Sequence, residues 1–492
     1  MATLLCVASL QVGVAWDESI YFAFSDSVRR WVAAGPAFDR ASILQAWAYS
    51  PYHNPHPPFP KAMSALTAAA LDGALPFPAA YRLAYHLYVG AALSVVYLLL
   101  RPAYGRLLAL AAVAFVLLQP RVFGDMLIAT TDASVAMGWL VVSLAAWRIA
   151  AAPAGVSARV PRIVMVLFYG FAVATKFTGA LVLLPAGAYL LLRSRLRETS
   201  FVAATGLYGL AFLVATSPEK WLAPVASVVE YLVYPLTRQK IPMTVYFLGT
   251  SYIHPPWTYF AVLSLVTYPV ALWLLLAGLA RLRREERELC LAVAVPLLFW
   301  LVLVHLPTTP RHDGVRQFLA VYPLLTLLAW TGFRRVVDEA ARHSRARHLR
   351  PAAVVAMAAI LALGVWRSHP HELAYYNAFV GGIRGAEASG MEMCYFLECV
   401  DPPFVRALNQ NVSAGSRVSM APYWPELLAT YQRHGLLRTD FTLQPEDAGP
   451  PDLLVYVRRR SRIEDATYRA LPALHETTYD GVSLAKLVRP VK

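Results

Sequence analysis

Apolar stretches separate the first three quarters of the chain into loops of two alternating kinds. One kind is short and rich in arginine, whereas the other is long and carries acids, histidines, prolines and aromatics, beginning with Trp16-Asp17-Glu18. Apolar runs of roughly 17–25 residues are long enough to cross a hydrocarbon core of about 30 Å. The pattern predicts a polytopic α-helical membrane protein with about 11 transmembrane helices, approximately at 1–15, 81–100, 107–120, 133–151, 162–175, 178–193, 201–217, 259–280, 289–306, 316–333 and 351–366.

The first apolar stretch begins at Met1 and allows two interpretations. It has the length of a signal-peptide core, but no basic segment comes before it and no small-residue cleavage motif comes before Trp16. We therefore interpret it as an anchor helix.

Arginine in the short loops predicts the orientation, because positive residues favour the cytoplasmic side. The arginine-rich side holds Arg101, Arg106, Arg148, Arg159, Arg162, Arg193, Arg195, Arg197, the run 281–288, Arg334, Arg335, Arg342, Arg345, Arg347 and Arg350. With an odd number of spans, the N-terminus lies inside and the segment 367–492 lies outside. Outside too we expect 16–80, 120–132, the turn at Lys176, 218–258 and 307–315.

Two of these outside segments have distinctive features: predicted helices in one and a group of charges in the other. The first, 16–80, contains two stretches with helical amphipathic spacing, 19–34 and 63–75, which predict helices on the outer leaflet around a proline-rich segment at 51–60. The second, 120–132, carries Arg121, Asp125 and Asp132. A charge at the bilayer centre costs at least about 2.5–3.5 kcal/mol, so we place these three at the interface between two spans.

The composition changes sharply after residue 366, which predicts two domains: a transmembrane catalytic domain at 1–366 and an extracytoplasmic tail at 367–492. The tail is expected to be a small α/β domain. Strands are predicted at 416–420 and 453–457, helices at 424–434 and 463–474, and a hairpin at 477–488 around Asp480-Gly481. Cys394 and Cys399 lie in this tail, either as a disulfide or as two free thiols.

Composition supports the membrane assignment and narrows the function. Of 492 residues, 58% are hydrophobic and 15% are charged, compared with about 25% charged residues in soluble proteins. The net charge of +14 does not indicate nucleic-acid binding, because the arginines lie beside apolar runs, where membrane topology puts them. No Walker loop, dinucleotide fingerprint, zinc-protease helix or nucleophile elbow occurs.

Acidic residues supply the candidate catalytic groups. Asp17 and Glu18 come where the first span ends, and they are either a polar stop or a carboxylate base that takes a proton from an acceptor hydroxyl. Asp132 and Lys176 are expected at the same membrane level. We therefore predict catalytic positions at Asp17, Glu18 and Asp132, with Asp17 first.

Basic residues on the same side are candidates for binding the phosphate of a donor. They are Lys61, Lys176, Arg238, Arg311, His312 and Arg316. Contact with lipid headgroups is the alternative explanation for some of them. His53 and His56 are more readily structural than zinc ligands, so no metal site is predicted, although Glu18 or Asp132 remains a candidate ligand for a divalent cation.

Several short motifs occur in an order that resembles a known family. They are Asp17-Glu18, His56-Pro57-Pro58-Phe59 with Lys61, the segments 120–123 and 129–132, the segment 174–179, Pro256-Trp257-Thr258-Tyr259 and the segment 371–377. This order is similar to that of the GT-C glycosyltransferases of family 39, which include the protein O-mannosyltransferases and the bacterial aminoarabinose transferase. The tail differs from the domains appended in the eukaryotic branch.

The resemblance implies inverting transfer of a sugar from a polyprenyl-phosphate donor, with Asp17 as the base and Lys61 and the other cations at the donor phosphate. The topology points to the same donor class, because nucleotide sugars are cytoplasmic whereas these acids face outward. We expect a glycan, lipid or protein hydroxyl as acceptor, and a location in a bacterial cytoplasmic membrane with the site facing the periplasm. The alternatives are a multi-pass transporter or lipid-handling scaffold, and a non-catalytic assembly factor whose tail binds a partner.

Overall fold

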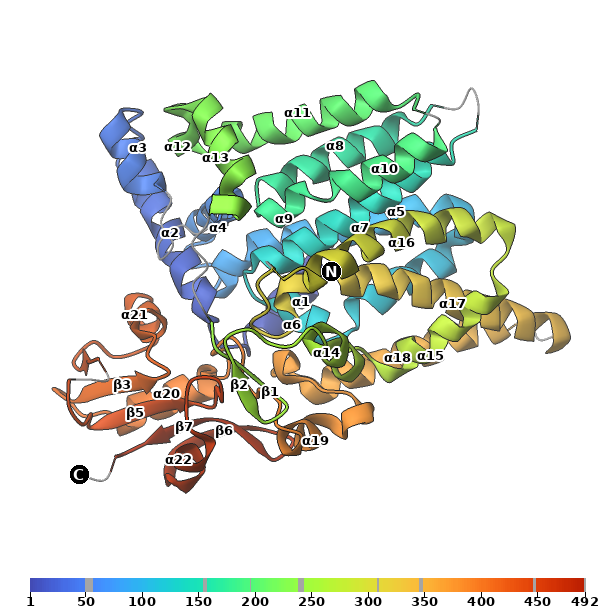
Figure 1. The fold of residues 1–492 in the computed structure, drawn as a ribbon. Coiled ribbons are helices and arrows are strands. Elements are labelled where there is room, and N and C mark those ends of the chain that lie inside the picture. The colour runs from blue at the N-terminus through green and yellow to red at the C-terminus, as the bar shows by residue number, and fades with distance from the viewer. Residues whose placement is uncertain are drawn as a thin grey trace.

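The computed structural model describes residues 1–48, 56–153, 157–194, 196–237, 243–307, 309–344, 348–445 and 448–490. A helical body carries a small sheet at one end (Figure 1). The helices up to residue 237 are α1 Ala2–Ser9, α2 Trp16–Ala33, α3 Arg40–Trp47, α4 Phe59–Ala70, α5 Ala79–Leu117, α6 Pro120–Leu127, α7 Thr131–Ala150, α8 Arg159–Val173, α9 Phe177–Ala180, α10 Leu183–Arg193, α11 Thr199–Ala215, α12 Pro218–Trp221 and α13 Pro224–Thr237.

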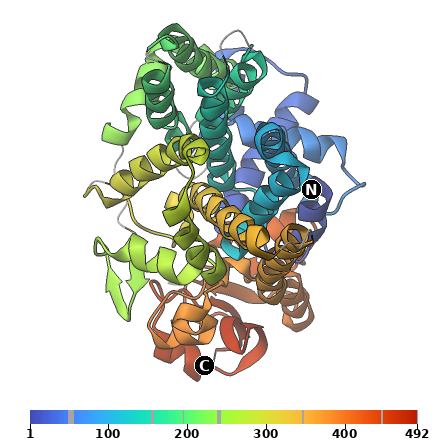
Figure 2. The same cartoon turned by 90° about the vertical axis from the view of Figure 1, so that its right-hand side faces the viewer.

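After a two-stranded ribbon, β1 Val245–Phe247 and β2 Thr250–Tyr252, the helical body continues to residue 368. Its remaining elements are α14 Tyr259–Thr267, α15 Val270–Leu275, the 3-10 helix η1 Leu276–Arg281, α16 Arg284–His305, the 3-10 helix η2 Arg316–Phe318, α17 Val321–Ser344 and α18 Leu349–Ser368. Figure 2 views the helical body nearly along its helices, among which α7 packs against α5, α8, α10, α16 and α17.

Each predicted span coincides with a helix or a pair of helices, but few of these are long. Within the described residues, the helices long and apolar enough to cross a membrane are Ala79–Leu117, Thr131–Ala150, Glu286–His305 and Leu349–Ser368. A fifth would be the bent pair of Tyr259–Thr267 and Val270–Arg281, whose parts meet at 102°. The longest of them, α5, is kinked at Gly105, where φ is +77°.

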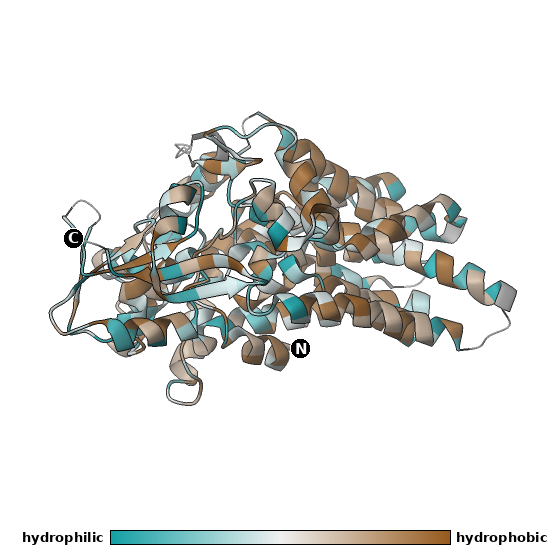
Figure 3. Ribbon diagram, turned by 90° about the horizontal axis from the view of Figure 1, so that it is seen from below, coloured by the Kyte–Doolittle hydropathy of each residue, from teal (hydrophilic) through white to brown (hydrophobic). Residues whose placement is uncertain are grey.

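The helix α7 forms the centre of the body. It packs against α5, α8, α10 and α16, and nearly all of its residues are buried. The indole Nε1 of Trp139, midway along α7, donates to the carbonyl of Thr178 at 3.0 Å. The outer helices instead expose apolar side chains such as Trp366 of α18, which is 81% exposed. Figure 3 shows the hydrophobic colouring concentrated in the helical end of the molecule, as expected for a lipid-facing surface.

The two amphipathic helices predicted between residues 16 and 80 are present as α2 and α4, which pack against each other. Most of the proline-rich segment between them lies outside the described residues. The segment 120–132, predicted at the interface between two spans, contains the helix α6 between α5 and α7. Every residue of α6 is buried within the protein, so neighbouring elements shield Arg121 and Asp125.

The tail holds a five-stranded mixed sheet in the order β4-β3-β5-β7-β6. Its strands are β3 Arg417–Ala421, β4 Thr442–Leu443, β5 Leu453–Val457, β6 Ala473–Tyr479 and β7 Val482–Val488. The helices of this region are α19 Gly382–Ala388, α20 Pro402–Asn411, α21 Pro425–Arg433 and α22 Asp465–Ala470, preceded by the 3-10 turns η3 Glu372–Ala374 and η4 Ala378–Val380. The predicted strands at 416–420 and 453–457 and the predicted helix at 424–434 are confirmed.

The hairpin prediction is also confirmed, but its first strand is longer than expected. Asp480 and Gly481 both have positive φ, as a two-residue hairpin turn requires. The helix predicted at 463–474 ends at Ala470, because the chain from Ala473 onward pairs antiparallel with β7. Sheet pairing therefore overrides the helical pattern at the end of that segment.

Candidate active site

Five charged residues from four separate segments form one network centred on the guanidinium of Arg316. We call this network the Arg316 cluster. Arg316 Nε donates to Asp132 Oδ2 at 2.9 Å, and its Nη2 forms an ion pair with Asp17. Its Nη1 lies 3.7 Å from Asp313 Oδ2. Lys176 Nζ donates to the other oxygen of Asp132, Oδ1, at 2.6 Å. The cluster is therefore a network of three carboxylates held by two cations.

Local structure explains why these side chains reach the same place. Asp17 and Asp132 both occupy the first turn of a helix, where the helix dipole stabilises a carboxylate. Lys176 lies in extended backbone at the N-cap of α9. Asp313 and Gly314 have consecutive positive φ values of +56° and +66°, a turn that brings the 3-10 helix starting at Arg316 back toward α7.

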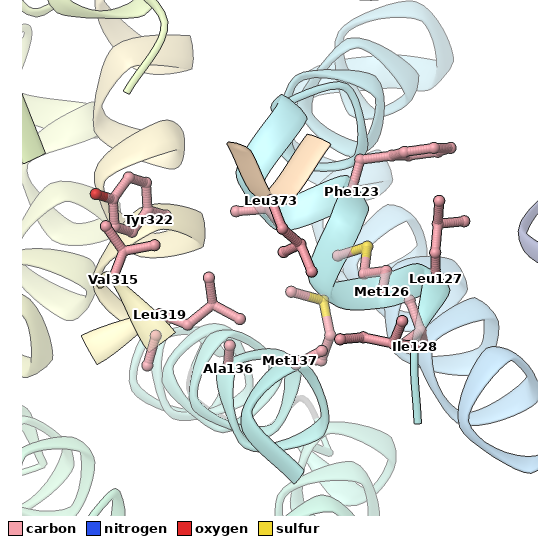
Figure 4. Packing of buried hydrophobic residues seen from close by; sticks show 14 of the residues in the cluster. Phe123, Met126, Leu127, Ile128, Ala136, Met137, Val315, Leu319, Tyr322 and Leu373 are labelled. Atoms are coloured by element: carbon pink, nitrogen blue, oxygen red, sulfur yellow. The ribbon is translucent and has the colours of Figure 1, made fainter. Parts of the chain in front are cut away.

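Apolar packing fixes these segments relative to one another. In the buried core between these elements, α6 supplies Phe123 and Met126, and α7 supplies Met137 (Figure 4). Val315 and Leu319, on either side of Arg316 and Phe318, belong to the same buried core (Figure 4). Because interiors are close-packed, a shift of any one of these elements displaces the charged groups attached to it.

Asp17 is the most accessible carboxylate of the cluster. Its side chain is 20% exposed, compared with 7% for Asp132 and 1% for Asp313. Burial raises the pKa of Asp17, and although Arg316 opposes this, the nearby Asp313 and Asp132 add to the rise. A carboxylate with a raised pKa is a better proton acceptor, so Asp17 combines access with basicity.

Asp313 has a different environment. Burial alone would raise its pKa, but His312 and Arg459 hold the pKa of Asp313 below its usual value. His312 Nδ1 lies 3.0 Å from Asp313 Oδ2, and Arg459 Nη2 donates to Asp313 Oδ1 at 2.6 Å. Asp313 is consequently a fixed anion that links the membrane part to the tail.

The structure places Glu18 in a buried ion pair rather than in the cluster. Arg82 donates to Glu18 from Nε at 2.7 Å and from Nη2 at 2.6 Å. The backbone N–H groups of Ala15 and Ala129 donate to the same carboxylate at 2.9 and 2.6 Å. With both oxygens occupied and no exposed surface, Glu18 fastens the start of α2 to α5 and to the segment that precedes Asp132.

Lys61 is buried beside the cluster without entering it. Its Nζ donates to the carbonyl of His56 at 2.7 Å and lies 4.9 Å from the ring centre of Phe24 and 5.4 Å from that of Tyr21. Burial lowers the pKa of Lys61 well below its usual value. Tyr21 is thus near Lys61, and the charges of Asp17 and Arg316 also act on its hydroxyl.

Arg311 and His312, two further predicted cations, have partners other than Asp17. Arg311 donates to backbone carbonyls of Pro255, His305 and Leu306 at 3.3–3.4 Å, so it braces the end of α16. His312 contacts the cluster only through Asp313. Arg238 lies outside the described residues.

Two residues near the cluster were not predicted as site residues. Arg459 from the tail donates to Asp313, and its guanidinium lies 4.3 Å from the ring centre of Trp16. Asp125 of α6 is fully buried, and neither of its carboxylate oxygens has a hydrogen-bond partner among the described residues. Burial, together with the Asp132 charge, raises the pKa of Asp125 to about 8. Asp125 appeared in the sequence only as an interfacial charge, and nothing in the sequence singled out Arg459.

The described residues contain no group of three or more His, Cys, Asp or Glu side chains placed to hold a metal ion. The oxygens of Glu18 are taken by Arg82 and backbone N–H groups, and those of Asp132 by Arg316 and Lys176. The donor set therefore does not fit the divalent cation considered for these two residues.

Comparisons with known proteins agree with this picture of the fold. Residues 55–221 match the family described as dolichyl-phosphate-mannose-protein mannosyltransferase. The apo crystal structure of ArnT from Cupriavidus metallidurans is similar over 99% of this chain and 96% of that one, with 14% identity and a TM-score of 0.54. The structure of the same protein bound to undecaprenyl phosphate covers the same shares at 14% identity, with a TM-score of 0.50. No curated protein matches the sequence.

The family match and the shared fold indicate a membrane glycosyltransferase of the GT-C type. The predictions of a GT-C fold, of a largely helical membrane protein with a small sheet domain at its C-terminal end, and of a glycosyltransferase are thereby confirmed.

Proposed function

We propose that this protein transfers a sugar from a polyprenyl-phosphate donor to a hydroxyl of an envelope glycan, lipid or protein, with inversion at the anomeric carbon. The observation that carries the proposal is the Arg316 cluster, in which an accessible carboxylate, Asp17, pairs with Arg316, and a second cation, Lys176, is linked to Arg316 through Asp132. Such an arrangement can accept a proton and stabilise a phosphate leaving group in the same place. The structural likeness to ArnT, which has been solved with undecaprenyl phosphate bound, supports the donor class.

In the proposed reaction, the acceptor hydroxyl attacks the anomeric carbon while the bond between that carbon and the phosphate oxygen breaks. Asp17 takes the hydroxyl proton, and the electron pair of the broken bond leaves with the lipid phosphate. Arg316 and Lys176 stabilise the negative charge that develops on that phosphate. Asp132, which bonds both cations, sets the distance between them.

Asp17 already bonds the guanidinium that would bind the phosphate. An incoming phosphate competes with Asp17 for Arg316, because both are anions. Displacement of Asp17 from this ion pair would leave its carboxylate free to accept the proton. Donor binding would then activate the base, which explains why the two functions share one arginine.

The direct test is to incubate the purified full-length protein with a panel of labelled polyprenyl-phosphate hexoses, pentoses and aminosugars. We expect release of free polyprenyl phosphate with at least one of these donors in the presence of a membrane extract that supplies acceptors. Nucleotide sugars should give no product. Transfer from a nucleotide sugar, or no release from any lipid donor, would contradict the proposal.

The proposed orientation places the cluster and the tail outside the cytoplasm, and labelling of introduced cysteines tests it. Ala414 is exposed in the tail, and Ser157 is exposed in an arginine-rich loop. In intact cells, a membrane-impermeant maleimide should label Ala414→Cys but not Ser157→Cys. The reverse result would place the site on the cytoplasmic side and exclude the proposed donor pool.

A further inference from the structure

Two cysteines of the tail lie in direct contact. The Sγ atoms of Cys394 and Cys399 are 2.8 Å apart, and both side chains are buried. The other two cysteines are distant in sequence, Cys6 in α1 and Cys290 in α16. A pair of thiols in this position is suited to a cross-link between Cys394 and Cys399 within one short loop.

The loop between these cysteines contacts the Arg316 cluster directly. The backbone N–H of Trp16, the residue before Asp17, donates to the carbonyl of Phe396 at 2.8 Å. The ring of Phe396 lies 5.4 Å from the guanidinium carbon of Arg316. A change in the path of this loop would therefore move both the start of α2 and the arginine at the centre of the cluster.

Tyr395, next to Phe396 in the same loop, connects the loop to Arg459 of the tail. The carbonyl of Tyr395 accepts a hydrogen bond from Arg459 Nη1 at 2.9 Å, while Nη2 of the same guanidinium holds Asp313. The ring of Tyr395 also packs closely against Gly314, two residues before Arg316. The loop thus supports three elements of the site at once: the start of α2, the 313–316 turn and Arg459.

The loop has an unfavourable backbone conformation that needs support. Leu397 has a φ of +65°, in the left-handed region that a branched residue rarely adopts, and it is fully buried. Glu398 Oε2 accepts a hydrogen bond from the backbone N–H of Phe396 at 3.1 Å, which closes the turn from inside. A covalent link between the loop ends would hold the same conformation independently of this hydrogen bond.

We infer that Cys394 and Cys399 form a disulfide that braces the active site. Two S–H bonds break and one S–S bond forms. The two protons and two electrons pass to a disulfide-bearing oxidant, such as a protein disulfide of an oxidising compartment, which becomes two thiols. The inference rests on the extracytoplasmic position of the tail proposed above, because disulfides persist in oxidising compartments.

The burial of the pair determines when the bond forms. Oxidation takes place during folding, before the loop is covered. In the folded protein, burial raises the pKa of both thiols, which would leave a reduced pair protonated and unreactive. The finished bond is shielded from reductants in the same way, so it is a permanent brace rather than a switch.

Thiol counting tests the bond itself. The protein, purified without reductant, is denatured and alkylated with iodoacetamide, then digested and analysed by mass spectrometry. We expect alkylation at Cys6 and Cys290, and a peptide joining Cys394 to Cys399 that gains two alkyl groups only after reduction. Alkylation of all four cysteines without reduction would overturn the inference.

Substitution of the two cysteines tests whether the disulfide supports the active site. A disulfide is lost completely when either partner is removed, so Cys394→Ala, Cys399→Ala and the double variant should show the same fall in melting temperature. Each should lose turnover on the order of tenfold through displacement of the cluster, whereas the control Cys6→Ala keeps both properties. Additive losses for the two single variants would overturn the bracing role, because they would indicate separate packing contributions.

These outcomes are distinct from those of the proposed function. If the protein releases lipid phosphate but shows four alkylated thiols, only the disulfide is excluded. If the disulfide is present but no donor reacts, only the transferase chemistry is excluded.

Discussion

Asp132 bonds Arg316 through one carboxylate oxygen at 2.9 Å, and its other oxygen accepts a hydrogen bond from Lys176 at 2.6 Å. One carboxylate therefore keeps two cations side by side that would otherwise repel each other. It also reduces their net charge, which limits how tightly they can hold an anion. This balance suits the proposed reaction, in which a lipid phosphate is bound and then released as a product.

Asp132→Asn tests this balance. Without the carboxylate charge the two cations should bind phosphate more tightly but be less well placed, so turnover should fall by about tenfold or more. Inhibition by free polyprenyl phosphate should occur at lower concentration than in the wild type. Weaker inhibition would indicate that Asp132 has no part in the charge balance of the cluster.

The Glu18–Arg82 pair predicts a change in stability rather than in chemistry. Both side chains are fully buried, and removal of one partner of such a pair typically costs about 3–5 kcal/mol. Glu18→Gln should therefore lower the melting temperature and the yield of folded protein. The folded fraction should keep turnover within about tenfold of the wild type, since Glu18 positions the start of α2 but its carboxylate does not contact the cations of the Arg316 cluster.

The double variant Glu18→Gln/Arg82→Met distinguishes this interpretation from a catalytic role of Glu18. Replacement of both members of a buried ion pair is often far less harmful than loss of one. The melting temperature of the double variant should therefore exceed that of Glu18→Gln. A folded Glu18→Gln protein with turnover reduced 100-fold would show that Glu18 takes part in the reaction.

Asp125 predicts a pH dependence of stability. Its pKa is about 8 in the folded protein, above that of an exposed carboxyl. Between about pH 4 and pH 8, Asp125 is therefore protonated in the folded state and ionised in the unfolded state. The contribution of Asp125 to the free energy of unfolding is complete below the pKa of the unfolded state and is lost as pH rises toward 8. The free energy of unfolding falls by at most about 1.4 kcal/mol per pH unit in this range. In Asp125→Asn this component disappears, so the melting temperature should fall less between pH 5 and pH 8. Equal slopes for the two proteins would exclude a neutral buried Asp125.

Because Arg459 connects the tail to Asp313, we expect the tail to contribute to turnover. In Arg459→Met, Asp313 loses its 2.6 Å ion pair and Trp16 loses its cation–π partner, so Asp17 and Arg316 become less well fixed. We expect turnover to fall by roughly tenfold with a smaller change in KM. Arg384→Met is the matched control, because Arg384 forms an exposed ion pair with Asp480 in the same region. A similar loss in both variants would indicate a general effect on the tail.

The sequence predicted the helical body and most of the tail because apolar periodicity reports directly on burial and on depth in a membrane. It also placed Asp17, Asp132, Lys176 and Arg316 at one membrane level, and the structure brings these four together. Periodicity does not report which side chains at that level face one another. Glu18 and Asp17 are adjacent in sequence, yet Glu18 turns toward Arg82, a partner fixed only by the packing of α2 against α5.

The sequence pattern likewise did not predict the partners of Arg459 or the surroundings of the segment 120–132. Arg459 lies in a run of three arginines that differ only in which acids they reach: Arg458 and Arg460 bind Asp465, whereas Arg459 binds Asp313 of the membrane part. The charges of 120–132 predicted a position at the interface between two spans, but they did not predict that neighbouring elements cover α6 completely. In both places the outcome depends on contacts between segments distant in sequence, which a one-dimensional pattern does not contain.

Comparison of Asp17→Asn with the wild type tests whether Asp17 is the base of sugar transfer, as we propose. The purified proteins are assayed with the same polyprenyl-phosphate sugar, and binding of undecaprenyl phosphate is measured alongside; Asp72→Asn, which alters an exposed carboxylate, is the control. We expect Asp17→Asn to lose turnover by a factor of about 100 or more while it still binds the lipid phosphate. Near-normal turnover of a folded Asp17→Asn protein would show that Asp17 is not the base.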